Sequence, residues 1–428
     1  MARHSPWRKA TQLPGHISAH LPRWRGSLLL LCIAQALATF GFTLFTPFLP
    51  LFVQTLGITD PAQAKLWAGL VSSIYMVGAT IATPVWSVLS DRYGRKIMLL
   101  RATCTAVLLL GLMGTVVTPW QLLILRLLQG LGAVVNPLVT VLASSMVPRE
   151  QMGFSLGLIQ GSVYVGSTFG PPLGGVVADR WGYRLAAYLG AGALAITSLL
   201  VLAGVRDRPD RPLPPPRAAQ RSDRRGLRAL LSNRALLELA LLFMLVRLAQ
   251  ALPQALVPLF VQELSALSER LATVAGGIMS AVALAGALAA VGVGRLADRF
   301  GHRRVLLSSS LAAALLGFAQ IFVRDNLQFG LLQFGSGFFV AGATLAVNAL
   351  VADQAQHGHE GADFGVVFGV SFVGWTVGPI IGSAVAATWA IRAVFGISAG
   401  LFLLASLWTA RSQQRTGRRS DAGGSTSH

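Results

Sequence analysis

Long apolar stretches separated by short polar segments recur along this 428-residue sequence. About 20 consecutive apolar residues form a helix long enough to cross a hydrocarbon core of ~30 Å. Stretches of that length occur twelve times, at 27–54, 66–89, 97–117, 120–144, 154–177, 184–204, 235–262, 271–294, 304–323, 326–351, 364–387 and 391–410. The pattern predicts an all-α membrane protein with twelve transmembrane helices.

The composition agrees with a membrane protein and argues against a soluble enzyme. Apolar residues make up 54% of the chain and charged residues 12%, whereas soluble domains carry roughly 25% charge. A net charge of +19 would suit a nucleic-acid binder, but the cations lie in short runs between apolar stretches, so we expect no nucleic-acid partner. Cys32 and Cys104 are too few for a disulfide framework or a cysteine-rich metal site, and no cofactor is expected.

The positions of Lys and Arg predict the orientation of the chain. Of the 35 cations, 27 fall in the N-terminal segment, alternate loops and the tail, six fall in the opposite loops, and Arg126 and Arg247 lie within spans. Because cytoplasmic loops carry an excess of Lys and Arg, both termini are expected in the cytoplasm. The segment 1–26 lacks an apolar core, so we expect an uncleaved first span.

The second half of the chain repeats the first at an offset of 207–208 residues. The string at Pro50–Gln54 recurs at Pro258–Gln262, and Ser90–Lys96 is echoed by Ala297–Arg303. One offset that holds across several loops indicates two parallel halves of six spans each. Such halves are expected of a transporter that rocks two bundles around a central site.

Five segments follow from the repeat and the composition. They are a cytoplasmic N-terminal segment (1–26), an N-terminal six-helix bundle (27–204), a cytoplasmic linker (205–234), a C-terminal six-helix bundle (235–410) and a disordered cytoplasmic tail (411–428). The linker carries nine Arg and five Pro, and since proline removes backbone donors and like charges repel, we expect it to be poorly ordered. An alternative is that its Arg-rich end lies on anionic lipid.

Two loops related by the repeat combine a carboxylate with several cations around a glycine. They contain Asp91, Arg92, Gly94, Arg95 and Lys96 after span 2, and Asp298, Arg299, Gly301 and Arg303 after span 8. A carboxylate that faces cations across a tight turn can hold two helices together in one conformational state and release them in the other. Cations that serve orientation alone would need neither the aspartate nor the same spacing twice.

These loops resemble the signature loop between spans 2 and 3 of the major facilitator superfamily and its copy between spans 8 and 9. The resemblance implies twelve transmembrane helices in two pseudo-symmetric six-helix bundles, and transport by alternating access. Ser87 stands where the family usually has glycine, while the second copy keeps Gly294. Helix packing at the first loop is therefore expected to be looser.

Two arginines lie inside predicted spans. Arg126 begins the string Arg126-x-x-Gln129-Gly130, which is similar to a motif of proton-coupled facilitators. An arginine in a span costs about 2.5–3.5 kcal/mol on insertion scales, so it should face protein or a water-filled cavity unless it snorkels to the interface. Arg247 lies about 18 Å into span 7, at 1.5 Å per residue, and should face the cavity alongside Arg126. The alternative is that carbonyls or lipid neutralise Arg247 and that it only holds the fold.

Span 5 carries a string rich in glycine and proline. Its residues are Gly161, Gly166, Gly170, Pro171, Gly174 and Gly175. Glycines four residues apart make one smooth helix face for close packing, and the proline favours a kink. Generic packing explains the glycines but not the whole string, which resembles the corresponding motif of drug antiporters.

The resemblance covers Ser27 to Arg411 and, within the superfamily, is greatest to twelve-span bacterial drug:proton antiporters. It implies a monomeric, multi-pass protein of the inner membrane that exports small amphiphilic compounds or drugs, with protons as the coupling ion. Polar and aromatic residues that could line its cavity are Gln35, Phe42, Asn136, Tyr164, Gln250, Gln254, Phe338 and Trp375. A proton-coupled symporter or facilitator for a small nutrient shares the fold and remains the alternative, whereas no catalytic constellation indicates an enzyme.

The acidic residues do not provide an obvious site for proton coupling. We expect none of them at mid-membrane, so coupling would rest on Asp91, Asp298 or the titration of the substrate itself. A cavity with cations but no carboxylate should favour neutral or anionic amphiphiles over lipophilic cations.

Overall fold

The computed structural model describes residues 23–148, 151–204, 234–265, 270–354 and 360–424. Within these ranges the chain forms helices joined by short turns, and no strand occurs. A backbone surrounded by lipid must satisfy its hydrogen bonds within each segment, which favours helices. Nearly all of the expected N-terminal segment and linker lies outside the described residues.

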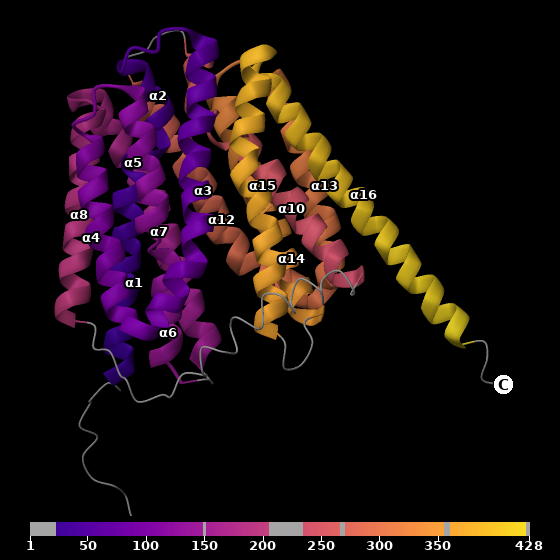
Figure 1. The fold of residues 1–428 in the computed structure, drawn as a ribbon. Coiled ribbons are helices and arrows are strands. Elements are labelled where there is room, and N and C mark those ends of the chain that lie inside the picture. The colour runs from indigo at the N-terminus through magenta and orange to yellow at the C-terminus, as the bar shows by residue number, and fades with distance from the viewer. Residues whose placement is uncertain (1–22, 149–150, 205–233, 266–269, 355–359, 425–428) are drawn as a thin grey trace, which may run out of the picture.

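The two halves have corresponding sets of helices (Figure 1). The N-terminal half contains α1 (Arg23–Thr43), η1 (Thr46–Phe48), α2 (Leu49–Thr55), α3 (Pro61–Tyr93), α4 (Arg95–Met113), α5 (Pro119–Gly132), α6 (Asn136–Met146), α7 (Met152–Trp181) and α8 (Tyr183–Gly204). The C-terminal half contains α10 (Arg234–Gln254), α11 (Val257–Leu264), α12 (Leu271–Phe300), α13 (His302–Ala319), η3 (Gln320–Phe322), α14 (Asn326–Gln354), α15 (Glu360–Thr388) and α16 (Ile391–Gly424).

The predicted spans coincide with these helices to within several residues. Among the described residues, 11 helical segments are long and apolar enough to cross a membrane. The remaining expected span, 154–177, lies within the 30-residue helix α7, whose glycines and serines make it less apolar. The predicted fold class, an all-α membrane protein built from two six-helix bundles, is confirmed.

The helix breaks follow the sequence repeat, with one exception. α2 begins at Leu49 and α11 begins at Val257, 208 residues later, and each has a proline in its first turn. Proline has no amide hydrogen to donate, so it is tolerated there but cannot continue the preceding helix. Span 4 is the exception, because it breaks before Pro137 of α6 while its counterpart α14 is continuous.

Each half has its own apolar core, and a third cluster joins the two. We call the end of the bundle at which α1 begins and α16 ends the terminal face, and the end that holds α2 and α11 the far face (Figure 1). In the joining cluster, Phe48 of the N-terminal half is buried together with Phe260, Phe329 and Phe395 of the C-terminal half. The latter three rings have centroids 4.9–5.5 Å apart. The halves are thus packed together toward the far face.

Helix α16 is longer than the sequence analysis expects. It continues to Gly424, whereas the sequence predicts a disordered tail from residue 411. The extension is rich in Arg and Gln, which are good helix formers, and a helix that is already formed propagates at little cost.

Candidate functional site

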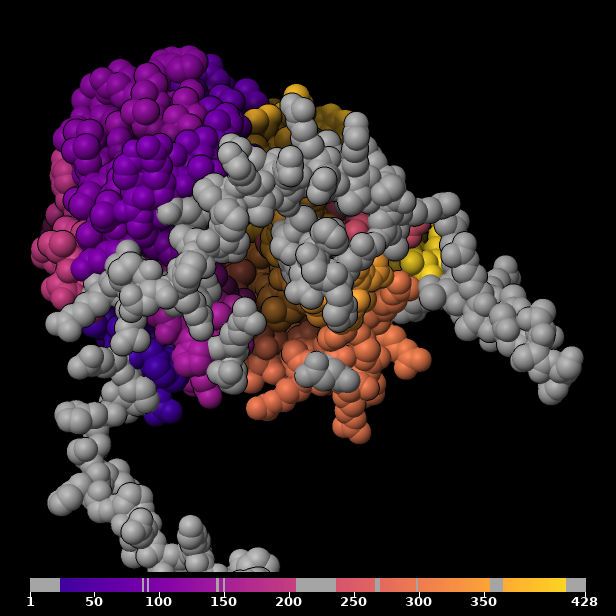
Figure 2. All heavy atoms as spheres, turned by 60° about the horizontal axis from the view of Figure 1, so that its bottom comes forward, coloured from indigo at the N-terminus to yellow at the C-terminus, as the bar shows by residue number. Residues whose placement is uncertain are grey.

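The two halves contact each other mainly through three pairs of helices: α7 with α12, α3 with α15, and α2 with α11. The helices approach closely because glycines of one helix lie against the backbone of the other. Gly175 of α7 lies against the backbone of Ala272, and Gly276 of α12 lies against that of Pro171. In the view toward the terminal face, the N-terminal half forms one mass and the C-terminal half lies beside it (Figure 2). Contacts between the halves therefore concentrate toward the far face.

A carboxylate of the N-terminal half caps a helix of the C-terminal half. Asp179, near the end of α7, accepts hydrogen bonds from the backbone N–H of Ala272 at 3.0 Å and of Thr273 at 2.7 Å, and from the Thr273 hydroxyl at 2.6 Å. The residue preceding α12 within its own half, Arg270, provides no side-chain cap. By contrast, α3 is capped from within its own half by Asp60. Because caps and negative charge stabilise the first turn of a helix, Asp179 joins the halves at the far face.

Further polar contacts also join the halves. The Nζ of Lys65 on α3 lies 2.8 Å from Oε1 of Glu263 on α11. The Ser280 hydroxyl of α12 donates a hydrogen bond of 2.6 Å to the carbonyl of Thr168 on α7. All of these contacts must break if the far face is to open.

A cavity of about 370 Å³ lies below these contacts. The N-terminal half contributes Thr43, Pro47, Ser167 and Pro171, and the C-terminal half contributes the remaining walls. Three of the predicted cavity residues, Gln250, Gln254 and Trp375, line it. The cavity is large enough for a drug-sized ligand, since ligand pockets occupy roughly 300–1,000 Å³.

Arg247 lies beside this cavity on α10. Its guanidinium carbon is 5.0 Å from the ring centroid of Trp375 and 4.9 Å from that of Phe243, distances typical of cation–π contacts. Its Nη1 is 3.4 Å from Oε1 of Gln250, and the Nε2 of Gln250 donates to the Thr344 hydroxyl at 2.9 Å. In the described part of the chain, no carboxylate lies within ion-pair distance of Arg247. The charge is therefore held by aromatic faces and one amide.

Arg126 is enclosed by protein instead. Only 7% of it is exposed. Its Nε donates to the carbonyl of Val71 at 3.2 Å, its Nη1 donates to Oε1 of Gln129 at 2.6 Å, and its guanidinium carbon lies 4.6 Å from the ring centroid of Tyr75. The arginine and glutamine of the motif thus bond each other within the N-terminal half. Neither Arg126 nor Arg247 is among the residues that line the cavity of about 370 Å³.

The glycine face of α7 packs mainly within its own half. A side chain at Gly166 would meet Ala36 and Thr39 of α1, one at Gly170 would meet Thr43, and one at Gly174 would meet Leu44. Gly175 and Pro171 instead face α12 of the other half, and Pro171 also lines the cavity. Gly161 has open space around it. The motif therefore serves two different contacts, and one of its glycines serves neither.

The two predicted gating loops are tight turns between helices. Gly94 joins α3 to α4 with φ 95°, and Gly301 joins α12 to α13 with φ 87°, a conformation that residues with a Cβ rarely adopt. Arg95 donates to the carbonyl of Val141 at 3.1 Å, and Lys96 donates to that of Leu202 at 2.8 Å. Arg92 and Arg299 are exposed. The side chains of Asp91 and Asp298 lie outside the described part of the structure, so the role of these loops stays a prediction.

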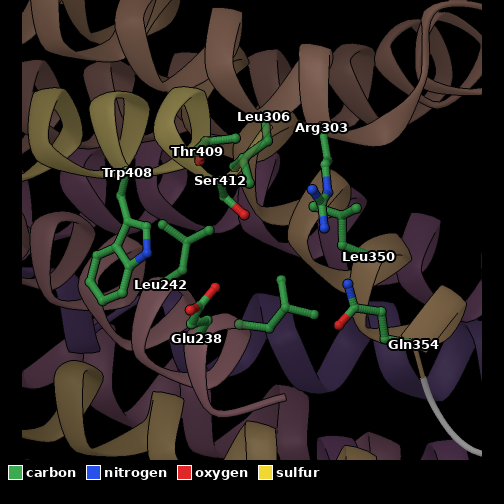
Figure 3. Close-up of a pocket in the computed structure, with 10 residues that line it drawn as sticks. Glu238, Leu242, Arg303, Leu306, Leu350, Gln354, Trp408, Thr409 and Ser412 are labelled. Carbon is green, nitrogen blue, oxygen red and sulfur yellow. The ribbon is translucent and has the colours of Figure 1, made fainter. Parts of the chain in front are cut away.

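Arg303 of the second loop lines a small pocket of about 40 Å³ at the terminal face of the C-terminal half. Figure 3 shows its guanidinium and the carboxylate of Glu238 directed into this space from α13 and α10. Trp408 and Ser412 of α16 form another wall. The pocket is too small for a drug and is a gap between packed helices.

The other predicted cavity residues contact neighbouring helices and are not among those that line the cavity. Gln35 is fully buried and donates to Asn136 at 2.6 Å and to Thr39 at 3.1 Å, which joins α1 to α6. Phe42 and Phe338 pack against the cores of their halves. Tyr164 lies against Gly286 of α12 at the contact between the halves.

Sequence reasoning overlooked Asp179, although a signal was present. The string Asp179-Arg180-Trp181-Gly182 has the same pattern as Asp91-Arg92-Tyr93-Gly94 in the first gating loop. Gly182 also turns the chain between two helices with φ 88°. The turn therefore occurs on both faces of the N-terminal half.

Comparisons with known proteins agree with this architecture. The family model of the Major Facilitator Superfamily matches residues 31–292 and 272–426. Multidrug resistance protein MdtG of Enterobacter lignolyticus (strain SCF1) is 32% identical over 394 residues, covering 92% of this chain and 94% of the relative. MdtG of Klebsiella pneumoniae (strain 342) is 32% identical over 399 residues, covering 93% and 96%.

Solved structures share the fold at low sequence identity. A bacterial homologue of the human lysosomal transporter Spinster, in an inward-facing and unoccupied conformation, has a TM-score of 0.73 at 14% identity, covering 91% of this chain and 96% of that one. The nucleoside transporter NupG has a TM-score of 0.69 at 17% identity, covering 91% and 99%. The chain therefore belongs to the major facilitator superfamily of membrane transporters, and within it resembles the multidrug resistance protein MdtG.

Proposed function

We propose that this protein exports small amphiphilic compounds, drugs among them, across the inner membrane of a bacterium. The observation that carries the proposal is the cavity of about 370 Å³ beneath contacts that close the far face. The names of the MdtG relatives, multidrug resistance proteins, support the same substrate class.

Transport proceeds by alternating access in a single chain. The terminal face is cytoplasmic, on the charge distribution of 27 cations against six. A compound enters between the halves, the contacts of α7 with α12 and of α3 with α15 separate, and the cavity opens to the far face. The described conformation is then the one that loads substrate from the cytoplasm.

Protons drive export in exchange for the compound. The coupling groups are Asp91 and Asp298, or the substrate itself when it titrates. Arg247 carries a positive charge beside the cavity without a carboxylate partner among the described residues, and this supports a preference for neutral and anionic amphiphiles.

Transport into inverted membrane vesicles tests the proposal. We expect uptake of several chemically unrelated compounds, and its loss when a protonophore removes the proton gradient. Uptake of one nutrient in whole cells, with no accumulation of drugs in inverted vesicles, would instead support the alternative of a nutrient symporter or facilitator. A cysteine at position 220 should react with an impermeant reagent only after permeabilisation if the linker lies in the cytoplasm, as the charge distribution predicts.

A further inference from the structure

The central cavity extends into the interior of the C-terminal half. Its walls include Ala313, Gly317 and Gln320 from α13 and η3, and Phe395, Ser398 and Phe402 from α16. These two helices pack on α10 and α14, and on each other. They stand on the side of the C-terminal half that lies away from the N-terminal half (Figure 1). The cavity therefore passes between α10, α12 and α14 to reach a second layer of helices.

Gln320 lines this extension, and its side chain has no hydrogen-bond partner among the described residues. Only 3% of the residue is exposed, and its side chain bonds no other group in the part of the chain that the structure describes. The amide therefore keeps its donors and its acceptor available at the cavity surface, where buried polar groups normally find a hydrogen-bond partner. Since Gln320 lines the cavity, a molecule inside the cavity can supply the missing partner.

The repeat shows that packing alone does not require an amide at this position. Pro119 and Asn326 begin the helices that follow, α5 and α14, at the offset of 207 residues, and the same offset relates Met113 to Gln320. Met113 is fully buried in the apolar core of the N-terminal half. Methionine and glutamine have similar length and volume, so the C-terminal half has an amide where the N-terminal half has only an apolar side chain.

We propose that the C-terminal half holds a ligand subsite in which the Gln320 amide donates to a neutral carbonyl of an otherwise apolar, aromatic compound. The body of the compound packs against Phe395, Phe402 and Trp375, which line the same cavity. This subsite specifies a substrate class for the proposed function and rests on it. It is distinct from the contribution of Arg247, because it recognises an uncharged group.

Benzophenone and diphenylmethane provide a matched pair of probes, since they differ only in a carbonyl in place of a methylene. We expect the purified protein to bind benzophenone about tenfold more tightly, the effect of one additional buried hydrogen bond. Gln320→Met should reduce the affinity for benzophenone to that for diphenylmethane and leave the latter unchanged. Gln328→Met, which changes an exposed glutamine of the same half, should affect neither.

Equal binding of the two probes to the wild-type protein, or an equal loss of both in Gln320→Met, would overturn the subsite. Benzophenone also labels adjacent C–H bonds under light, which gives a measurement that needs no variant. Label on peptides of α13 and α16 supports the subsite, and label confined to the N-terminal half contradicts it. If vesicles transport drugs but the protein binds benzophenone and diphenylmethane equally, the subsite alone is wrong. If the protein distinguishes the two probes but transports no drug, the proposed function is wrong.

Discussion

Gln54 and Gln262 occupy equivalent positions in the two halves and bond each other through both amides. Each donates its Nε2 to the Oε1 of the other, at 2.9 and 3.1 Å, and the 208 residues between them equal the offset of the repeat. A contact of a residue with its own equivalent lies on the axis that relates the two copies. The pseudo-twofold axis of the transporter therefore emerges at the far face between α2 and α11.

Cross-linking at this axis should arrest transport. With Cys32 and Cys104 replaced, cysteines at positions 54 and 262 joined by a short, cleavable bifunctional reagent would hold the far face closed. We expect vesicle transport to cease and to return when the reagent is cleaved. Each single cysteine treated in the same way is the control, and undiminished transport by the cross-linked protein would show that this face does not open.

Asp179→Asn should favour the conformation in which the far face is open. The asparagine side chain loses the negative charge and one of the two oxygens that accept from α12, so the contact weakens by about 1 kcal/mol, or roughly fivefold in the equilibrium between the two states. A cysteine at Ser383, buried against Gly69 at the contact between the halves, reports on opening through its reaction with an impermeant maleimide. Asp60→Asn removes a cap of similar kind within one half and should leave the reaction rate unchanged.

Arg247→Ala should alter which compounds are exported. Export of an anionic drug should fall more than tenfold relative to export of a cationic drug of similar size, because the loss of the guanidinium removes the positive charge beside Trp375. Paired uptake measurements in inverted vesicles determine the ratio. If the wild-type protein prefers the cation and the variant keeps that preference, the idea of an electropositive cavity is wrong.

Arg126→Ala should instead lower the amount of folded protein, since Arg126 is buried among Val71, Tyr75 and Gln129.

Gly170→Leu should impair the protein while Gly161→Leu should not. A Cβ at Gly170 would collide with the Thr43 hydroxyl, and a larger side chain in such a packed contact costs about 1–3 kcal/mol. A Cβ at Gly161 would meet nothing within 4 Å, although it belongs to the same motif. Thermal stability of the purified variants and their rates of transport and proton leak test this contrast. If the two variants have the same stability and the same transport rate, the glycine motif does not act through helix packing.

Asp91→Asn should lower transport without preventing insertion. The change removes the charge but keeps the size of the side chain at the turn of Gly94, where Arg95 and Lys96 already bond carbonyls of α6 and α8. We expect a drop of at least tenfold in transport at normal expression, and a smaller drop in Asp298→Asn. Normal efflux by Asp91→Asn at normal expression would count decisively against a gating role.

The sequence was sufficient for the fold because the bilayer limits the alternatives. An apolar stretch of about 20 residues in lipid must be helical, so spans follow from hydropathy, and the repeat groups them into halves. The surroundings of individual side chains could not be predicted from hydropathy and the repeat. Arg126 and Arg247 are both cations inside spans, yet one is surrounded by its own half and the other stacks beside the cavity.

Contacts between the halves were the least predictable feature. Asp179 bonds residues 93 and 94 positions later in the chain, and no local pattern indicates which helix end it will reach. Gln320 was also indistinguishable in the sequence from any glutamine at the end of a span. Its importance comes from a cavity that only the packed helices create.

The turn made by Asp, Arg, an aromatic residue and a positive-φ glycine has a consequence for the ancestry of the molecule. When the spans are counted in consecutive groups of three, this turn follows the second span in each of the first three groups. The glycines are Gly94, Gly182 and Gly301, with φ between 87° and 95°. The copies at Gly94 and Gly182 are 88 residues apart and lie on opposite faces of one half, as expected when two three-helix units face in opposite directions. The chain is thus composed of four three-helix units. The fourth has Ala387, Thr388, Trp389 and Ala390 at the corresponding positions, so it keeps the aromatic residue and a turn between α15 and α16 but lacks the aspartate, the arginine and the glycine.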